Sequence, residues 1–217
     1  MKILLRSPNW VGDAIMATPV PRLLRQTWPA CRIHVLAKPW TAPVWEQHPD
    51  VEKIIPLAQG RAAGGAQLRE LRGEKYDLGL VLPNSFSAAW LTFRAGCRER
   101  VGYATEHRGW LLTRRLPWSR AVREGARPQA YLRLAQAAGG GGTEVQERPF
   151  ILQVTPAELA HAAELMGNMD RRPWVGLAPG SVASSRRWPA ERFARLADRL
   201  RQNGCRVVLV GSGADAQ

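Results

Sequence analysis

Short apolar runs alternate along the chain with stretches in which apolar residues recur at helical spacing. The short runs predict β-strands at residues 2–6, 32–38, 51–57, 76–83 and 99–103, and the helical spacing predicts helices at 14–28, 42–49, 86–94 and 128–138. Strands that alternate with helices are typical of parallel βαβ units. The first part of the chain is therefore predicted to form an α/β domain with a doubly wound parallel sheet.

The same alternation starts again near the C-terminus. A helix is predicted at 157–167, a strand at 174–179, a helix at 190–202 that Gly204 ends, and a strand at 205–213. Two parallel strands and one helix cannot cover both faces of a sheet. We therefore expect a Rossmann-like N-terminal domain at 1–168 and, at 169–217, the first βαβ unit of an incomplete second domain. Either the chain is a fragment of a longer protein, or these C-terminal residues pack against the first domain.

Two glycine-rich stretches interrupt this rhythm. Residues 60–65 read GRAAGG, and residues 137–144 contain four consecutive glycines after a predicted helix. Glycine favours turns and lowers helix stability. Both stretches are predicted to be loops.

Composition places the chain among globular proteins. Its 217 residues are 45% hydrophobic and 23% charged, and no apolar run reaches the length of a membrane-spanning helix. Polar residues interrupt the N-terminal apolar run before it reaches the length of a signal peptide, so a cytoplasmic protein is expected. The formal net charge of +13 favours an acidic partner, such as phosphates, nucleic acid or an anionic membrane face. The arginines are scattered, however, so a basic surface without a specific target is an alternative, and no nucleic-acid-binding motif accompanies them.

Cysteine and histidine spacing indicates no metal site. Cys31, Cys97 and Cys205 are odd in number and far apart, without a CxxC pair, and are expected to be reduced thiols. The four histidines show no ligand spacing. We expect neither a metal nor another cofactor.

Residues 7–19, SPNWVGDAIMATP, join the first predicted strand to its helix. Ligands of open α/β sheets bind beyond the carboxyl ends of the strands, where this segment lies. Asp13 can cap the helix, or it can act as a carboxylate base at the mouth of a cleft; the two roles are compatible. Gly12 is a turn residue or leaves room for a substrate.

Two further segments are predicted at strand ends. Asn84 and Ser85 follow the fourth strand and either contact a ligand's hydroxyl or acidic groups or form an ordinary turn with a helix cap. Gly180 and Ser181 lie between a strand and a helix and can offer donors to a phosphate, which Arg186 can grip. The alternative for Arg186 and its neighbour Arg187 is a solvated surface pair.

Three segments carry a family resemblance. PNWVGD, VLPNSF and RRWP, in this order, are similar to segments of the bacterial lipopolysaccharide heptosyltransferases, and the similarity runs through all 217 residues. The resemblance implies a GT-B glycosyltransferase, in which two Rossmann-like domains bind acceptor and donor. The N-terminal domain would bind the inner core on lipid A, and the C-terminal domain would bind the donor ADP-heptose.

The resemblance also implies a mechanism and the site residues. Asp13 matches the proposed catalytic base of an inverting, metal-independent transfer, and Trp10, Gly12, Asn84 and Ser85 fall on the acceptor side. Gly180, Ser181, Arg186 and Asp215 fall on the nucleotide-sugar side, although the family commonly has lysine where Arg186 stands. Most of the donor half would lie beyond Gln217, so this chain alone is expected to transfer no heptose at a useful rate. Peripheral contact with the anionic face of the inner membrane would suit the positive charge.

Two alternatives remain open at this point. Gly211, Gly213 and Ala216 match the GxGxxA fingerprint of dinucleotide-binding proteins after a predicted strand. Such a site would need an acidic residue about 20 positions later, and the chain ends first. The second alternative is a non-catalytic module that binds anionic glycolipid or nucleic acid through its charge.

Overall fold

The computed structural model describes residues 1–139, 149–167, 171–181 and 184–211. The chain forms two compact units, Met1–Thr155 and Pro156–Gln217. Most of the glycine-rich stretch 137–144 lies outside the described residues. The expected domains, 1–168 for acceptor binding and 169–217 for donor binding, stay predictions.

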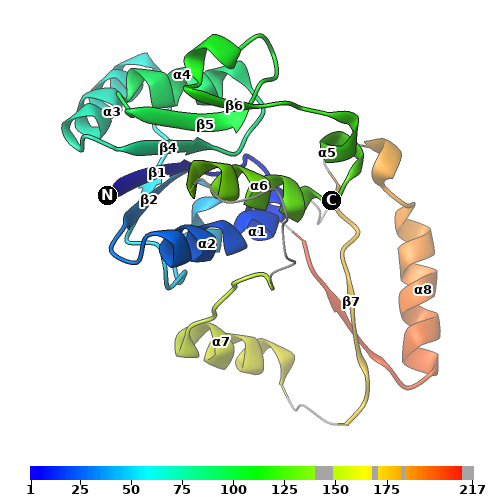
Figure 1. Cartoon of the computed structure of the whole chain (residues 1–217). Coiled ribbons are helices and arrows are strands. Elements are labelled where there is room, and N and C mark those ends of the chain that lie inside the picture. The colour runs from blue at the N-terminus through cyan, green and yellow to red at the C-terminus, as the bar shows by residue number, and fades with distance from the viewer. Residues whose placement is uncertain (140–148, 168–170, 182–183, 212–217) are drawn as a thin grey trace. The chain divides into compact units, whose positions relative to one another are not determined.

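The larger unit is built on a six-stranded sheet in the order β3-β2-β1-β4-β5-β6 (Figure 1). Its strands are β1 (Lys2–Arg6), β2 (Arg32–Ala37), β3 (Lys53–Pro56), β4 (Leu78–Val81), β5 (Glu99–Tyr103) and β6 (Arg114–Leu116). Every neighbouring pair is parallel. The order reverses between β1 and β4, as in a Rossmann fold, and such a reversal is where ligands of open α/β sheets bind. The predicted doubly wound parallel sheet is confirmed.

Helices cover both faces of this sheet (Figure 1). One layer contains α1 (Val11–Ala17), α2 (Pro19–Thr27) and α6 (Arg127–Gly139), and the other contains α3 (Arg61–Gly73) and α4 (Phe86–Arg94). Shorter elements are η1 (Ala42–Trp45), η2 (Gly109–Leu111) and α5 (Arg120–Glu124). Successive side chains of β1 alternate between the layers: Ile3 and Leu5 pack with α1, α2 and α6, while Leu4 packs in the cluster that contains Leu71 of α3.

Two local predictions are wrong, and two elements were not predicted. The single helix expected at 14–28 is two helices, because Pro19 has no N–H to continue the ladder, and α2 starts there after Thr18. Residues 61–65 belong to α3 rather than to a loop. Gln67 of that helix donates to the carbonyl of Pro56 (2.7 Å) and accepts from the N–H of Ala58 (2.9 Å), which ties the helix to the end of β3. The edge strand β6 and helix α5 had no clear apolar pattern and were not predicted.

The smaller unit contains a parallel pair of strands joined through a helix. It comprises α7 (Pro156–Met166), β7 (Trp174–Leu177), η3 (Ser184–Arg186), α8 (Ala190–Gln202) and β8 (Arg206–Leu209). Gly204 has φ +78°, the left-handed conformation that ends helices, so the predicted stop after α8 is confirmed. The predicted βαβ unit is therefore present. Among the described residues of both units, no helix has the length and apolar character needed to cross a bilayer.

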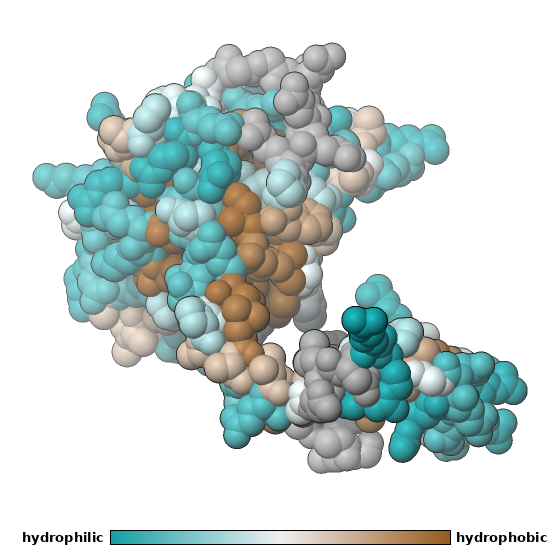
Figure 2. Space-filling view, turned by 90° about the horizontal axis from the view of Figure 1, so that it is seen from below, coloured by the Kyte–Doolittle hydropathy of each residue, from teal (hydrophilic) through white to brown (hydrophobic). Residues whose placement is uncertain are grey.

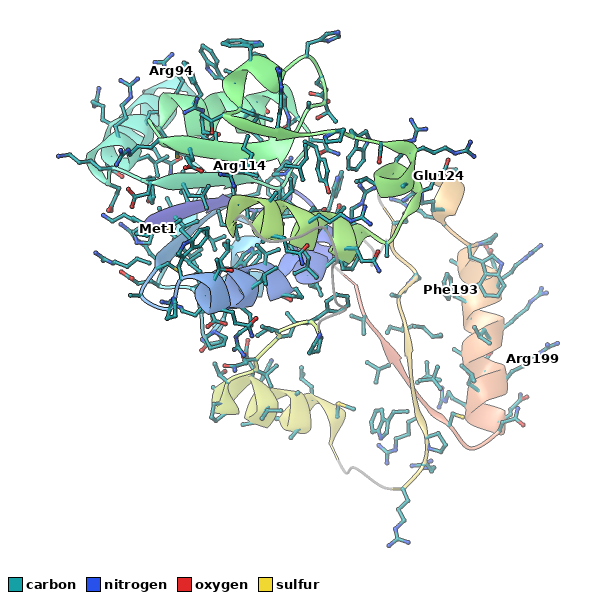
Figure 3. All side chains as sticks on the ribbon, in the orientation of Figure 1. Met1, Arg94, Arg114, Glu124, Phe193 and Arg199 are labelled. Atoms are coloured by element: carbon teal, nitrogen blue, oxygen red, sulfur yellow. The ribbon has the colours of Figure 1, made fainter. Side chains whose placement is uncertain are left out.

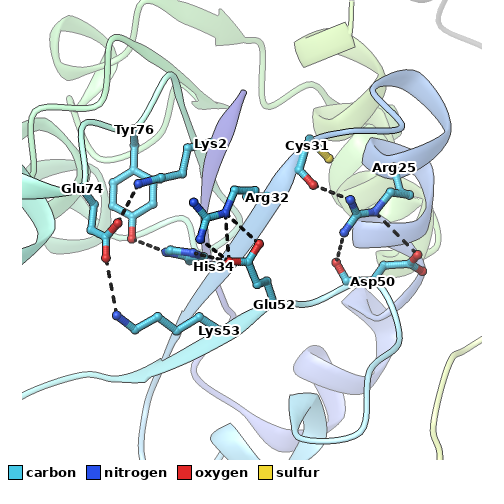
Figure 4. A network of polar contacts seen from close by, with 10 residues as sticks. All are labelled: Lys2, Arg25, Cys31, Arg32, His34, Asp50, Glu52, Lys53, Glu74 and Tyr76. Carbon is cyan, nitrogen blue, oxygen red and sulfur yellow. Dashed lines mark hydrogen bonds and ion pairs between the residues drawn. The ribbon is translucent and has the colours of Figure 1, made fainter.

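A polar network joins β1, β2 and β3 at their amino ends (Figure 4). Lys2 Nζ lies 2.7 Å from Glu74 Oε2, and Arg32 forms a two-pronged ion pair with Glu52. Buried His34 of β2 lies between them, with Nδ1 2.8 Å from the hydroxyl of Tyr76. Arg32 and Glu52 are exposed, so this pair contributes little to stability. The network lies at the edge of the sheet away from the loops that follow β1 and β4.

His48 is a buried histidine held in its neutral form. Its Nε2 lies 2.8 Å from the carbonyl oxygen of Thr18 and must donate, while Nδ1 accepts the N–H of Asp50 at 3.2 Å. Burial lowers the pKa of His48 from 6.5. If Nδ1 were protonated, its N–H would face the N–H of Asp50, and two donors facing each other cannot form a hydrogen bond. His48 therefore favours folding only while it stays neutral.

We expect the free energy of unfolding of the chain to fall as the pH drops from 7 to 5. The lowered pKa of His48 means that the unfolded chain takes up a proton below about pH 6.5 before the folded chain does, so acid favours unfolding. Urea unfolding at several pH values measures the slope. A His48→Gln variant should show a shallower slope whatever its absolute stability, and a slope equal to that of the unmodified chain would contradict this role.

Candidate functional site

The segment after β1 is fixed by buried side chains. Arg6 is almost fully buried, and its guanidinium donates to the carbonyl of Ser7 and, at 2.6 Å, to Asn9 Oδ1. Two indole N–H groups add anchors: Trp45 donates to Ser7 Oγ (3.0 Å) and Trp40 to the carbonyl of Asn9 (2.8 Å). Burial lowers the pKa of Arg6 to about 10, which leaves it protonated at neutral pH. The chain therefore enters α1 with a defined direction.

Asp13 lies in the first turn of α1. The N-cap position is Trp10, with extended backbone and no side-chain cap, so the interpretation of Asp13 as the N-cap residue is wrong. A carboxylate in a first turn is still favoured by the partial positive charge of the helix N-terminus. Gly12 is exposed, with open space where a Cβ would stand, and therefore leaves the approach to this turn unobstructed.

A pocket of about 240 Å³ opens beside Asp13, at the carboxyl ends of β1 and β4. It is lined by Pro8, Asn9, Trp10, Asp13, Leu82, Pro83, Asn84, Ser85, Tyr103, Trp118, Arg127, Ala130 and Tyr131. Four of the residues selected from the sequence, Trp10, Asp13, Asn84 and Ser85, thus lie around one cavity. Trp10 is 62% exposed, so its indole face is open to a ligand.

Tyr131 of α6 holds the Asp13 carboxylate. Its hydroxyl donates to Asp13 Oδ1 at 3.1 Å. Burial, and then the nearby Asp13 charge, raise the pKa of Tyr131, so the phenol stays protonated and remains a donor. The second carboxylate oxygen has no hydrogen-bond partner among the described residues. It is available to accept a proton from a ligand.

Asn84 and Ser85 are held by the segment that follows β5. Thr105 Oγ1 donates to the carbonyl of Asn84 (2.7 Å), and the guanidinium of buried Arg108 donates to the carbonyls of Pro83 and Ser85. Ser85 occupies the N-cap position of α4, but its side chain does not cap the helix. Asn84 Oδ1 is buried and lacks a hydrogen-bond partner among the described residues. A ligand hydroxyl in the pocket can satisfy it.

Arg127 and Tyr131 belong to the pocket and were not selected from the sequence. They are four residues apart on α6, so they share one helix face. The Arg127 guanidinium lies 5.5 Å from the ring centroid of Trp118, another pocket residue. The sequence carried a weak signal, an arginine and a phenol at i and i+4 in a helix that otherwise buries small and aliphatic residues. The sequence did not show which element this face of α6 contacts.

The second set of predicted residues lies in the smaller unit. Gly180 and Ser181 follow β7, and Arg186 ends η3, just before α8. Arg187 donates from Nε to the carbonyl of Ser181 at 2.6 Å. Arg186 and Arg187 are both exposed, so the alternative of a solvated surface pair stays open, with one added hydrogen bond from Arg187. Asp215, Gly213 and Ala216 lie outside the described residues.

The described residues contain no cluster of three or more histidine, cysteine, aspartate or glutamate side chains that could hold a metal ion. The chemistry at the pocket in the larger unit is that of a carboxylate, a phenol, an amide and a guanidinium. These groups can bind a hydroxyl-rich, acidic ligand and remove a proton from it.

Comparison with known proteins gives consistent results. The family model described as glycosyltransferase family 9 (heptosyltransferase) matches residues 65–217. Lipopolysaccharide heptosyltransferase 2 of Escherichia coli K12 is 34% identical over 99% of this chain, and the chain spans 64% of that relative's length.

Solved structures agree. The chain matches the structure of Escherichia coli ADP-heptose lipopolysaccharide heptosyltransferase II with a TM-score of 0.80 and 31% identity, over 99% of this chain and 66% of that one. A glycosyltransferase family 9 structure from Veillonella parvula, 22% identical over 63% of its length, shows the same fold with a TM-score of 0.82. The resemblance read from the three sequence segments is thereby confirmed, and the chain belongs to glycosyltransferase family 9, the heptosyltransferase family.

Proposed function

We propose that this chain carries the acceptor half, and the start of the donor half, of an inverting transferase that moves heptose from ADP-heptose to the inner core of lipopolysaccharide. The observation that carries the proposal is the placement of Asp13, at a pocket beyond the carboxyl ends of β1 and β4. Tyr131 binds one of its carboxylate oxygens, and the other has no partner in the part of the chain that the structure describes. The chain's membership of a heptosyltransferase family supports this proposal.

Asp13 acts as the general base. The free carboxylate oxygen takes the proton of an acceptor hydroxyl, the hydroxyl oxygen attacks the anomeric carbon of the heptose, and ADP leaves from the opposite face with the bonding electron pair. Tyr131 keeps the carboxylate oriented, so that no rotation is needed before the proton moves. Gly12 leaves the approach open, and Trp10 offers a stacking surface to a sugar ring.

The acceptor is recognised by charge as well as by shape. Inner-core sugars carry carboxylates and phosphates, and half-buried Arg127 faces the same pocket as Asp13. Buried Asn84 Oδ1 needs a donor, which an acceptor hydroxyl supplies. The protein would work in the cytoplasm, with peripheral contact to the anionic face of the inner membrane.

The donor contacts begin in the loop between β7 and α8. Gly180 and Ser181 follow the end of β7 and offer hydrogen-bond donors to the diphosphate. Arg186 neutralises the charge that develops as ADP leaves. Arg187 shapes this loop through the carbonyl of Ser181. The family resemblance adds Asp215, which lies outside the described residues, to the nucleotide contacts. The forked guanidinium of Arg186 can grip two phosphate oxygens at once.

Radiolabelled heptose incorporation tests this function. The complete protein that contains this sequence, given ADP-heptose and heptose-deficient inner-core acceptor, should transfer heptose without added metal. An Arg186→Gln variant should raise KM for ADP-heptose about tenfold, the effect expected of one charge-assisted phosphate contact. Arg192→Gln, an exposed arginine on α8, serves as the matched control and should leave KM unchanged. Transfer from another nucleotide sugar but not from ADP-heptose would refute the proposed donor.

The dinucleotide-binding alternative receives no support. Two of its three fingerprint residues, Gly213 and Ala216, lie outside the described part of the chain, and the family match indicates a transferase. A non-catalytic glycolipid-binding module would bind acceptor without turnover in the same assay. The heptose incorporation experiment therefore separates it from the transferase.

A further inference from the structure

Four aromatic rings gather on the outer surface of the larger unit. Phe86, Trp90 and Phe93 lie at i, i+4 and i+7 on α4, and Trp110 comes from η2. Trp110 lies with its ring centroid 6.2–6.3 Å from each of the other three rings, and Trp90 lies 6.2 Å from Phe86 and 5.7 Å from Phe93. We call these four residues the aromatic cluster.

The aromatic cluster is open to solvent. Trp110 is 63% exposed and the other three rings are 37–39% exposed. Grouped exposed aromatic rings differ from scattered surface hydrophobics, which need no explanation. A group of this size on a solvent-exposed surface indicates a binding surface.

Arginines border the aromatic cluster. The guanidinium of Arg94 lies 5.6 Å from the ring centroid of Trp90, and that of Arg100 lies 5.4 Å from Phe93. Figure 3 shows Arg94 extending outward beside α4. The side chain of Arg115 reaches the position beside Gly109, next to Trp110. Glu106, the carboxylate nearest in sequence to this face, accepts the N–H of Phe86 at 2.8 Å and so is engaged at the start of α4.

The composition of this surface matches a membrane interface. Tryptophan prefers the boundary between headgroups and acyl chains, and arginines beside it attract anionic headgroups. The chain as a whole carries a net charge of +13. Figure 2 views the larger unit from the side opposite α4, and there hydrophilic side chains surround an apolar patch. A basic surface with a local group of aromatic rings complements an anionic bilayer in both charge and polarity.

The position of the aromatic cluster relative to the pocket also favours a membrane as its partner. Ser85 lines the pocket, and Phe86, the next residue, begins both α4 and the cluster. An acceptor that is anchored in a bilayer brings its sugar to the protein only when the protein lies close to that bilayer. We infer that the aromatic cluster and Arg94 form the surface by which this chain binds an anionic phospholipid bilayer, an inference that takes its choice of partner from the proposed function.

Vesicle co-sedimentation of the purified 217-residue chain tests this inference, with no donor or acceptor present. The chain should bind vesicles of phosphatidylglycerol and phosphatidylethanolamine and should bind phosphatidylcholine vesicles much more weakly. Trp110→Ser should weaken binding to the anionic vesicles about tenfold, through lost apolar burial. Arg94→Gln should weaken it about fivefold, the effect of one basic residue at an anionic surface.

Matched variants control for general loss of tryptophan or charge. Trp188→Ser removes an exposed tryptophan of the smaller unit, and Arg120→Gln removes an exposed arginine of the larger unit; each should change binding less than twofold. Trp110→Phe should restore part of the binding lost in Trp110→Ser. The urea unfolding midpoint of every variant checks that the chain is folded.

Three outcomes would overturn the inference. These are equal binding of Trp110→Ser and the unmodified chain, equal binding to anionic and zwitterionic vesicles, and a dimer in sedimentation velocity that Trp110→Ser converts to monomer. The last result would assign the aromatic cluster to contact between copies of the chain. Transfer to a detergent-solubilised acceptor does not depend on the cluster, so a failure here leaves the proposed transferase function standing. Loss of transfer with intact vesicle binding would refute the proposed transferase function and leave the membrane-binding inference standing.

Discussion

Replacement of Asp13 by asparagine is expected to reduce heptose transfer by about 10²- to 10⁴-fold in the complete protein, the contribution of a positioned general base. Asparagine keeps the shape of the side chain and can still accept from Tyr131, but it cannot take a proton from the acceptor hydroxyl. The KM for ADP-heptose should change little, because Asp13 belongs to the larger unit's pocket. Initial rates at saturating donor and acceptor measure the loss.

Two variants make this result interpretable. Glu70→Gln removes an exposed carboxylate on α3, in the opposite helix layer, and should transfer at the normal rate. Tyr131→Phe keeps the buried ring and removes only the hydroxyl that holds Asp13 Oδ1, so it should retain part of the activity, between the two extremes. Transfer by Asp13→Asn at the normal rate, with an unchanged pH dependence, would exclude Asp13 as the base.

Replacement of Arg108 by methionine is expected to lower the free energy of unfolding of the larger unit by about 3–5 kcal/mol. The Arg108 side chain is fully buried, and it donates to the carbonyl oxygens of Tyr103 (2.9 Å), Pro83 (2.5 Å) and Ser85 (2.8 Å). Methionine fills similar volume but removes three hydrogen bonds from a charged donor, each worth about 1.5–3 kcal/mol. The Tyr103 carbonyl keeps the N–H of Thr105 (3.0 Å), so the expected loss is smaller than the sum of the three. Urea unfolding, followed by circular dichroism, measures the change.

The comparison for Arg108 is Arg115→Met, which removes an exposed arginine from the adjoining strand β6. It should change stability by less than about 0.5 kcal/mol. Arg108→Lys retains a charge but not the forked donors, and should recover only part of the loss. Burial lowers the pKa of Arg108 to about 10, so it stays protonated throughout such measurements at neutral pH. Equal stability of the methionine variant and the unmodified chain would contradict the structural role.

Arg108 also connects stability to the site. Its guanidinium joins the end of β5 to the segment that carries Asn84 and Ser85, two residues selected from the sequence for acceptor contact. Residues 106 and 107 have φ values of +47° and +55°, in the left-handed region that non-glycine residues seldom adopt. This strained turn brings Arg108 back under the pocket. The sequence showed no sign of it.

Local sequence determined the strands other than β6 and most of the helices. The predicted ranges 86–94, 99–103 and 190–202 coincide with α4, β5 and α8. Local reasoning failed where tertiary contacts outweigh propensity. Residues 61–65, with two glycines, are helical because Leu71 is buried in the core and Gln67 is tied to the end of β3.

The sequence also determined where a site should lie. Asp13 and Asn84 each follow a strand of a parallel sheet, and parallel strands end at one edge, so proximity of the two was expected before any coordinates. Only the tertiary structure added Tyr131 and Arg127. Tyr131 is 118 residues from Asp13 and reaches it because α6 packs beside α1. A hydrophobic pattern tells which face of α6 is buried but not what that face meets, because the partner depends on how distant elements pack.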